Sequence, residues 1–104
     1  MAEESIESRL ISAINKHDDY DYQNSFEMIE QIINLIRDQI VPPLHPILIR
    51  TYAYDRDNPG EILIVSRKHL IEALVQIRLN NLDATIENLS EYLRLMTLYF
   101  NRDR

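Results

Sequence analysis

The stretch "ILIRTYAYDRDNPGEILIVS", residues 47–66, decides the fold class of this chain. It holds two runs rich in β-branched and aromatic residues, ILIRTYAY and ILIVS, on either side of the tripeptide NPG. Such residues favour strands, and Asn, Pro and Gly favour turns. Gly60, the only glycine in the chain, adopts a positive φ at little cost. The stretch therefore predicts a β-hairpin.

The acidic residues of the same stretch raise the alternative of a calcium loop. An EF-hand loop that began at Asp55 would need oxygen ligands at its third and fifth positions and a bidentate Glu at its twelfth. Asp57 suits the third position, but Pro59 occupies the fifth and Ser66 the twelfth. Proline offers no side-chain ligand and serine cannot chelate in a bidentate manner. We interpret the loop as a turn without a metal.

Two helices are expected before this hairpin. Apolar residues at helical spacing predict the first at about 4–16 and the second from Asn24 to Val41. Pro42 and Pro43 end the second helix, because proline lacks an amide hydrogen and disfavours the helical conformation in the residue before it.

Two further helices are expected after the hairpin. Ser66 is predicted to cap a third helix that runs to about Asn80, and Asp83 to cap a fourth. The predicted fold class is α+β and mostly helical, in the order helix, helix, β-hairpin, helix, helix, with the helices packed on a small antiparallel sheet. The chain, 1–104, is expected to form a single domain.

The composition narrows the classes of function. The 104 residues carry a formal net charge of −6, which argues against indiscriminate nucleic-acid binding, and they include no cysteine. No run approaches the roughly 20 apolar residues of a membrane span, and the acidic N-terminus lacks the features of a signal peptide. We therefore expect a cytoplasmic protein without a membrane contact. Abundant Ile, Asn, Asp and Tyr with one Gly would suit a viral or mobile-element accessory protein.

Signatures of enzymes are nearly absent. One glycine excludes the glycine-rich loops that bind phosphates and dinucleotides. His17, His45 and His69 lie in three separate segments, so a zinc site would need all three to meet in space. The sequence predicts no enzyme, no catalytic residue, no metal and no cofactor.

The last predicted helix carries the strongest indication of an interface. Its apolar residues repeat with spacings of four and three, and the apolar arc is wider than docking onto one core requires. One side is expected to face the chain's own core and the other a second copy. The predicted homodimer or partner interface comprises Leu82, Ile86, Leu89, Tyr92, Leu93, Leu95, Met96, Tyr99 and Phe100, together with Tyr52 and Tyr54 on the more polar face of the first strand.

The sequence thus favours a non-enzymatic protein-interaction domain, acting as an adaptor, inhibitor or assembly subunit. Its expected partners are a second copy and an unidentified protein. The alternative is a small dimeric nucleic-acid-binding regulator, since a β-hairpin after helices resembles the wing of a winged-helix domain. That alternative would use Arg50, Arg56, Arg67 and Lys68 at the hairpin and the start of the third helix. A third possibility is an acidic first half that acts as a decoy for a basic partner.

Overall fold

The computed structural model describes residues 5–39 and 58–102, and its last helix pair begins inside the stretch quoted above. Helix α3 spans Pro59–Arg78, so residues 62–66, predicted as the second strand, are helical. The predicted first strand, 47–54, lies outside the described residues. The described part is entirely helical, and the α+β prediction is wrong.

The sequence NPGE is a helix start rather than a hairpin turn. Asn58 is the N-cap, and its Oδ1 accepts a hydrogen bond of 3.2 Å from the backbone N–H of Glu61. Pro59 occupies the first turn, where its missing amide hydrogen is not needed. Gly60 does not adopt a positive φ. Burial of residues four apart, Ile62, Ser66 and Leu70, then overrides the strand propensity of ILIVS.

The other helices begin and end near their predicted bounds. α1 spans Ile6–Asp18, α2 spans Tyr22–Gln39 and α4 spans Leu82–Phe100. Asn81 is the N-cap of α4, where Asp83 was expected. Asn80, the residue before this cap, lies in the left-handed region with φ 58°. Ser66, the expected cap of the third helix, instead lies buried within α3.

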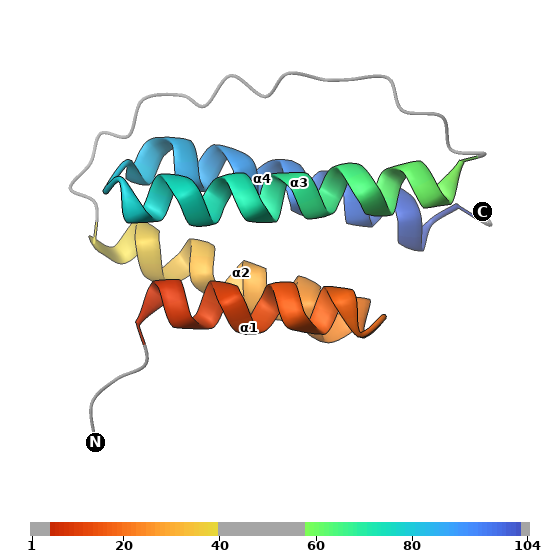
Figure 1. Cartoon of the computed structure of the whole chain (residues 1–104), viewed down its shortest axis with the longest axis horizontal. Coiled ribbons are helices and arrows are strands. Elements are labelled where there is room, and N and C mark those ends of the chain that lie inside the picture. Colours follow the sequence, from red (N-terminus) through yellow and green to blue (C-terminus); the bar gives the residue numbers. More distant parts are fainter. Residues whose placement is uncertain (1–4, 40–57, 103–104) are drawn as a thin grey trace.

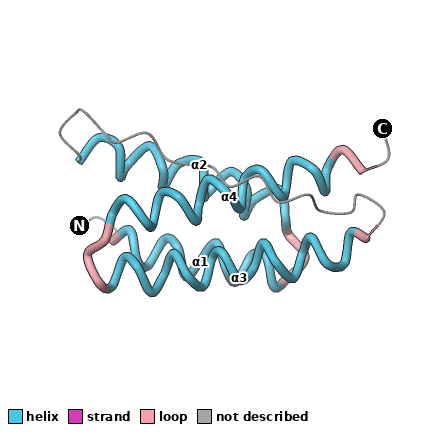
Figure 2. Tube along the Cα trace, turned by 90° about the horizontal axis from the view of Figure 1, so that it is seen from above, coloured by secondary structure: helices cyan, strands magenta, loops and turns pink. Residues whose placement is uncertain are grey.

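The four helices form a bundle of two helical hairpins, α1–α2 and α3–α4 (Figure 1). Among these described helices α1 and α4 each pack against both α2 and α3, whereas the pairs α1–α4 and α2–α3 lie across the bundle diagonals. Helices α2 and α3 run in the same direction, and α1 and α4 run in the opposite one (Figures 1 and 2). Every neighbouring pair of helices is therefore antiparallel.

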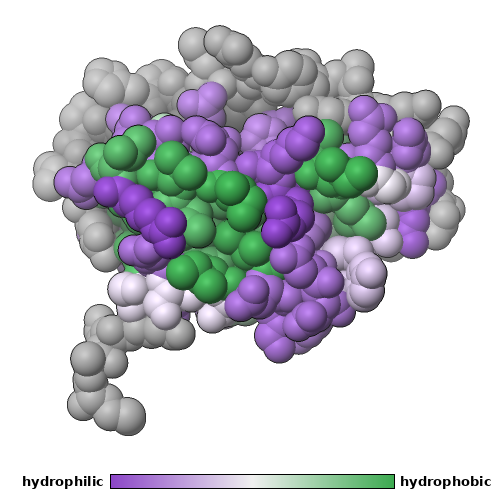
Figure 3. Space-filling model, in the orientation of Figure 1, coloured by the Kyte–Doolittle hydropathy of each residue, from purple (hydrophilic) through white to green (hydrophobic). Residues whose placement is uncertain are grey.

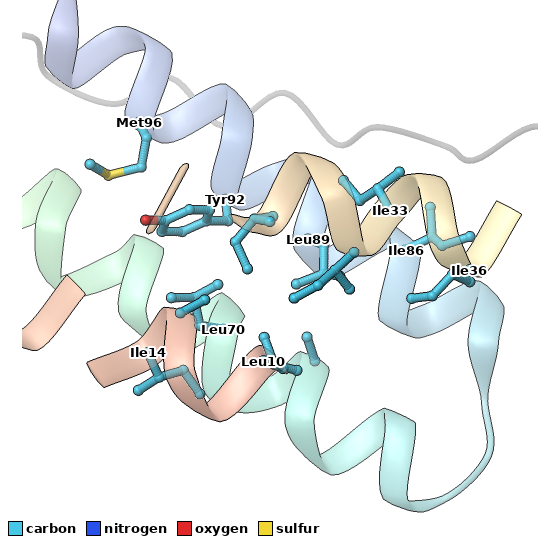
Figure 4. Close-up of a cluster of buried hydrophobic side chains, with 13 residues drawn as sticks. Leu10, Ile14, Ile33, Ile36, Leu70, Ile86, Leu89, Tyr92 and Met96 are labelled. Atoms are coloured by element: carbon cyan, nitrogen blue, oxygen red, sulfur yellow. The ribbon is translucent and has the colours of Figure 1, made fainter. Parts of the chain in front are cut away.

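The core receives aliphatic side chains from all four helices (Figure 4). Leu10 of α1, Leu70 of α3 and Leu89 of α4 are fully buried, as is Ile36 of α2. The apolar face predicted for the second helix is confirmed, because Ile29, Ile32, Ile33 and Ile36 are all buried.

The two helical hairpins repeat each other with an offset of sixty residues. Each turn has one residue in the left-handed region, Tyr20 with φ 64° in the first and Asn80 with φ 58° in the second. The backbone hydrogen bonds around the turns also correspond, as in Asp21 N–H to Lys16 O and Asn81 N–H to Gln76 O, both 2.9 Å. The sequences LISAI at 10–14 and LIEAL at 70–74 occupy equivalent positions. The fold is thus an internal repeat.

Two ion pairs between α1 and α3 obey the same repeat. Arg78 donates to Glu7 over 2.6 Å, and Arg67 donates to Asp18 over 2.8 Å. Glu7 and Arg67 occupy equivalent positions, as do Asp18 and Arg78. The approximate two-fold axis of the repeat therefore exchanges the two ion pairs, and each acid takes the place of a base. Two copies of α1 in this arrangement would set Glu7 against Asp18. The charges therefore favour α1 against α3 over either helix against itself.

Candidate functional site

A chain of polar side chains crosses the core between three helices. The Ser25 hydroxyl donates to Ala13 O over 2.9 Å and lies 2.8 Å from the Tyr92 hydroxyl. The Tyr92 hydroxyl is 3.2 Å from His17 Nδ1, and His17 Nε2 is 3.2 Å from Leu63 O. α1, α2 and α4 supply the side chains, and α3 supplies the terminal carbonyl. We call His17, Ser25 and Tyr92 the polar core.

The number of protons available for hydrogen bonds in the polar core depends on the charge of His17. The two terminal carbonyls only accept, so Nε2–H of His17 donates to Leu63 O, and Ser25 donates to Ala13 O. When the imidazole is neutral, the single Tyr92 hydroxyl proton must serve two contacts, one with His17 Nδ1 and one with Ser25 Oγ. An imidazolium would supply the missing proton.

Burial opposes the charged forms of the polar core. Ser25 and Tyr92 are fully buried and His17 is 5% exposed. Desolvation lowers the pKa of His17 from 6.5, although the hydrogen bond to Leu63 O acts in the other direction. Desolvation also raises the pKa of Tyr92 to about 12. A neutral, enclosed Ser–Tyr–His set offers no approach to a substrate, so its role is to specify the packing of the three helices.

In the described part of the chain, the other chemistry-bearing groups do not converge. Within residues 5–39 and 58–102, no group of three His, Cys, Asp or Glu side chains is placed to hold a metal ion. His69 Nδ1 is 2.9 Å from Asn88 Oδ1 of α4, and no contact of His69 with the polar core is seen among the described residues. His45 lies outside the described residues. Among the described helices, none is long and apolar enough to cross a membrane.

The predicted interface on the last helix is mostly the inner face of the chain's own bundle. Its fully or almost fully buried members are Ile86, Leu89, Tyr92, Leu95 and Met96. Leu82, Leu93 and Tyr99 are partly buried against the core cluster. Phe100 is 37% exposed and its ring packs edge-on against Phe26, with 5.6 Å between centroids.

The predicted basic residues do not form a free cluster in the described part. Arg67 is exposed but is bound to Asp18 through two hydrogen bonds of 2.8 and 3.2 Å, and that carboxylate holds the pKa of Arg67 above its usual value. Lys68, one residue on, is exposed as well. Arg50 and Arg56, like Tyr52 and Tyr54, lie outside the described residues.

A surface feature that the sequence analysis did not predict is an apolar stripe on the outer face of α3. Ile64, Ile71, Val75 and Leu79 are 61%, 37%, 43% and 68% exposed. Their spacings of seven, four and four place them on one side of a helix with 3.6 residues per turn. The buried side of α3 lies opposite. We call these four residues the α3 stripe.

The α3 stripe lies on the face of the molecule formed by α1 and α3. Figure 3 views this face and shows apolar surface over α3 in two areas divided by hydrophilic residues. Ile11 of α1, 38% exposed, belongs to the same face. The signal in the sequence was the spacing of the four residues, but the predicted boundary at Ser66 assigned Ile64 to a strand and the other three to a helix.

Comparison with protein-family models, curated proteins and solved structures finds no match to this chain. The function must therefore be inferred from the geometry.

Proposed function

We propose that this chain is a non-enzymatic protein-interaction domain that binds another protein through the α3 stripe. The observation that carries the proposal is that α3 has two apolar faces, of which the bundle buries one. A helix that is apolar on opposite sides is normally covered on both. The partner is a protein helix, because a narrow stripe with residues seven and four apart matches the groove of a facing helix.

The repeat supplies an internal control for this proposal. The positions of α1 that correspond to Lys68, Ile71, Val75 and Leu79 are Ser8, Ile11, Asn15 and Asp19. Apart from Ile11, the outer face of α1 is polar at these positions. The bundle therefore does not require the apolar residues of the α3 stripe, and we attribute them to binding.

The predicted interface on α4 and the predicted basic residues are weaker candidates for binding a protein or a nucleic acid. Most of the apolar α4 side chains are buried in the chain's own core, so α4 exposes little apolar surface to a second protein. A nucleic-acid contact would need several cations free of internal partners, whereas among the predicted cations in the described residues Arg67 is bound to Asp18, which leaves Lys68. We propose no second function.

A photo-activated cross-linking residue at position 75, introduced in cells of the native host, tests this function. We expect a protein adduct from position 75 and none from position 31, where Gln31 is exposed on the diagonal helix α2. Adducts that resist nuclease support the proposal. An absence of protein adducts at position 75, or adducts lost on nuclease treatment, would contradict it.

A further inference from the structure

We infer that the partner of the α3 stripe is a second copy of this chain, bound through α3 in an antiparallel, two-fold symmetric pair. This inference rests on the proposed function and names its partner. It is carried by the self-complementary order of apolar and charged residues along the outer face of α3.

The apolar order of the stripe is compatible with an antiparallel copy of itself. With a two-fold axis beside Ile71, Ile64 of one copy lies against Leu79 of the other, and Ile71 lies against its own equivalent. Lys68, the remaining residue of this face, then lies beside Val75 of the second copy. Its long aliphatic stem covers apolar surface while its ammonium group reaches solvent.

The charged residues select the antiparallel direction. Lys68 and Glu72 border the stripe on the edge away from α1, and both are exposed. In an antiparallel pair the same edges meet, so Lys68 of each copy approaches Glu72 of the other. In a parallel pair opposite edges meet, so this edge would face the edge that carries Arg67 and Arg78, and the cross-pairs of Lys68 with Glu72 could not form.

The pairing states of the cations agree with this assignment. On the edge that adjoins α1, Arg67 and Arg78 are already neutralised by Asp18 and Glu7. Within the described residues, Lys68 has no such intrachain partner. The two cross-pairs of Lys68 with Glu72 therefore supply the charge complementarity of the two-fold interface.

The size of the surface predicts a weak dimer. A helix of 20 residues is about 30 Å long, and one pair of helices covers less than the roughly 800 Å² per partner of a standard stable interface. We therefore expect a dissociation constant in the micromolar range, visible by sedimentation equilibrium of the purified full chain between about 5 and 500 μM.

The first variants test the apolar contact. Val75→Glu places a charge twice in a two-fold interface but sits at an exposed position, so the chain should keep its helical circular dichroism and become monomeric, with dimerisation weakened roughly a hundredfold or more. Gln31→Glu adds the same charge on α2 and should dimerise like the wild type. A Val75→Glu variant that dimerises normally would overturn the inference, as would a wild type that is monomeric throughout this range.

The second variants test the second copy directly. Lys68→Glu alone and Glu72→Lys alone each create like-charge pairs and should weaken self-association about tenfold. An equimolar mixture of the two variants restores both opposite-charge pairs and should form heterodimers at wild-type strength. A mixture that associates no better than its components contradicts the inference.

The two proposals fail separately. A purified chain that remains monomeric, together with an adduct between position 75 and a different protein in cells, removes the second copy and keeps the proposed function. The absence of any protein adduct at position 75 in cells contradicts the proposed function itself.

Discussion

The two helical hairpins are alike in their buried core residues and their turns, and they differ on their outer faces. Equivalent positions hold Leu10 and Leu70, which are both fully buried, and the turns repeat each other bond for bond. The outer faces differ, because α3 carries an apolar stripe where α1 is largely polar. Residues that are the same in both hairpins are explained by the packing of the core. Residues that differ, such as those of the α3 stripe, need a reason other than packing.

The polar core is the second difference between the halves. His17 and Tyr92 are present once, and their equivalents in the other hairpin are Ile77 and Ile32. Ser25 and Thr85 are equivalent and both buried, yet Ser25 bonds to Ala13 O and approaches Tyr92, whereas Thr85 donates to Asn81 O one turn before it. The polar core joins side chains of both hairpins, and the positions that the repeat relates to His17 and Tyr92 are apolar.

Truncation of the equivalent leucines is the strongest test of the repeat. Leu10→Ala and Leu70→Ala each remove a fully buried side chain, and each should lower the free energy of unfolding by about 3 kcal/mol. Urea denaturation followed by circular dichroism measures both. If one substitution costs less than about 1 kcal/mol, the two positions are not equivalent in packing.

The polar core should make the stability depend on pH through His17, because its equivalent, Ile77, does not titrate. The pKa of His17 is lowered in the folded chain, so the unfolded chain binds the proton first as the pH falls below 6.5. The contribution of neutral His17 is therefore present above that pH and is lost on acidification. Asp18 and Arg67, which act on His17 in opposite directions, stay charged over this window.

Unfolding of wild type and His17→Gln at pH 8 and pH 5 measures this contribution. We expect the wild type to lose more stability on acidification than the variant, because glutamine does not titrate. The variant Ile77→Val, at the equivalent apolar position, should keep the wild-type pH dependence. If wild type and His17→Gln lose the same free energy of unfolding on acidification, His17 is not the source of the pH dependence.

The ion pairs should give a smaller, reciprocal effect. Arg78→Glu sets two acids together at the α1–α3 contact and should cost up to about 1 kcal/mol, since exposed ion pairs contribute little. The double variant Glu7→Arg with Arg78→Glu should recover most of that loss. Arg67→Glu, at the pair related by the repeat, should behave the same way, and unequal costs would break the two-fold relation.

The smallest expected change in stability concerns the first turns of α3, which have no equivalent in α1. Gly60→Ala should raise the free energy of unfolding by about 0.5 kcal/mol, because alanine favours a helix and loses less backbone freedom on folding. A Cβ at this position would meet only Asn58 Oδ1, at 3.8 Å. A substantial loss of stability would instead favour the turn with positive φ that the sequence suggested.

The helices with a one-sided apolar pattern could be predicted from the sequence. The second helix was expected from Asn24 to Val41 and spans Tyr22–Gln39, because its isoleucines mark one face and two prolines follow. The fold class failed at residues 58–66, where Asn, Pro and Gly suit both a turn and the first turn of a helix. Glu61, three residues after Asn58, was the available signal, since a carboxylate there completes a capping box.

The polar core could not be predicted, because its contacts depend on tertiary packing. His17 and Tyr92 are 75 residues apart in sequence, and neither has a local pattern that points to the other. The repeat could have been found, since LISAI and LIEAL recur with conserved spacing. It would have marked Val75 and Leu79 as apolar residues in place of Asn15 and Asp19.

The shared direction of α2 and α3 has a mechanical consequence. It places the start of α1 and the end of α4 at opposite ends of the bundle (Figure 1). Tension applied between those two points acts along the helix axes and must slide α1 and α4 past their neighbours, which loads many side-chain contacts at once. A bundle with both points at one end would peel open contact by contact. The bundle should therefore resist tension along its axis better than a bundle with both points at one end.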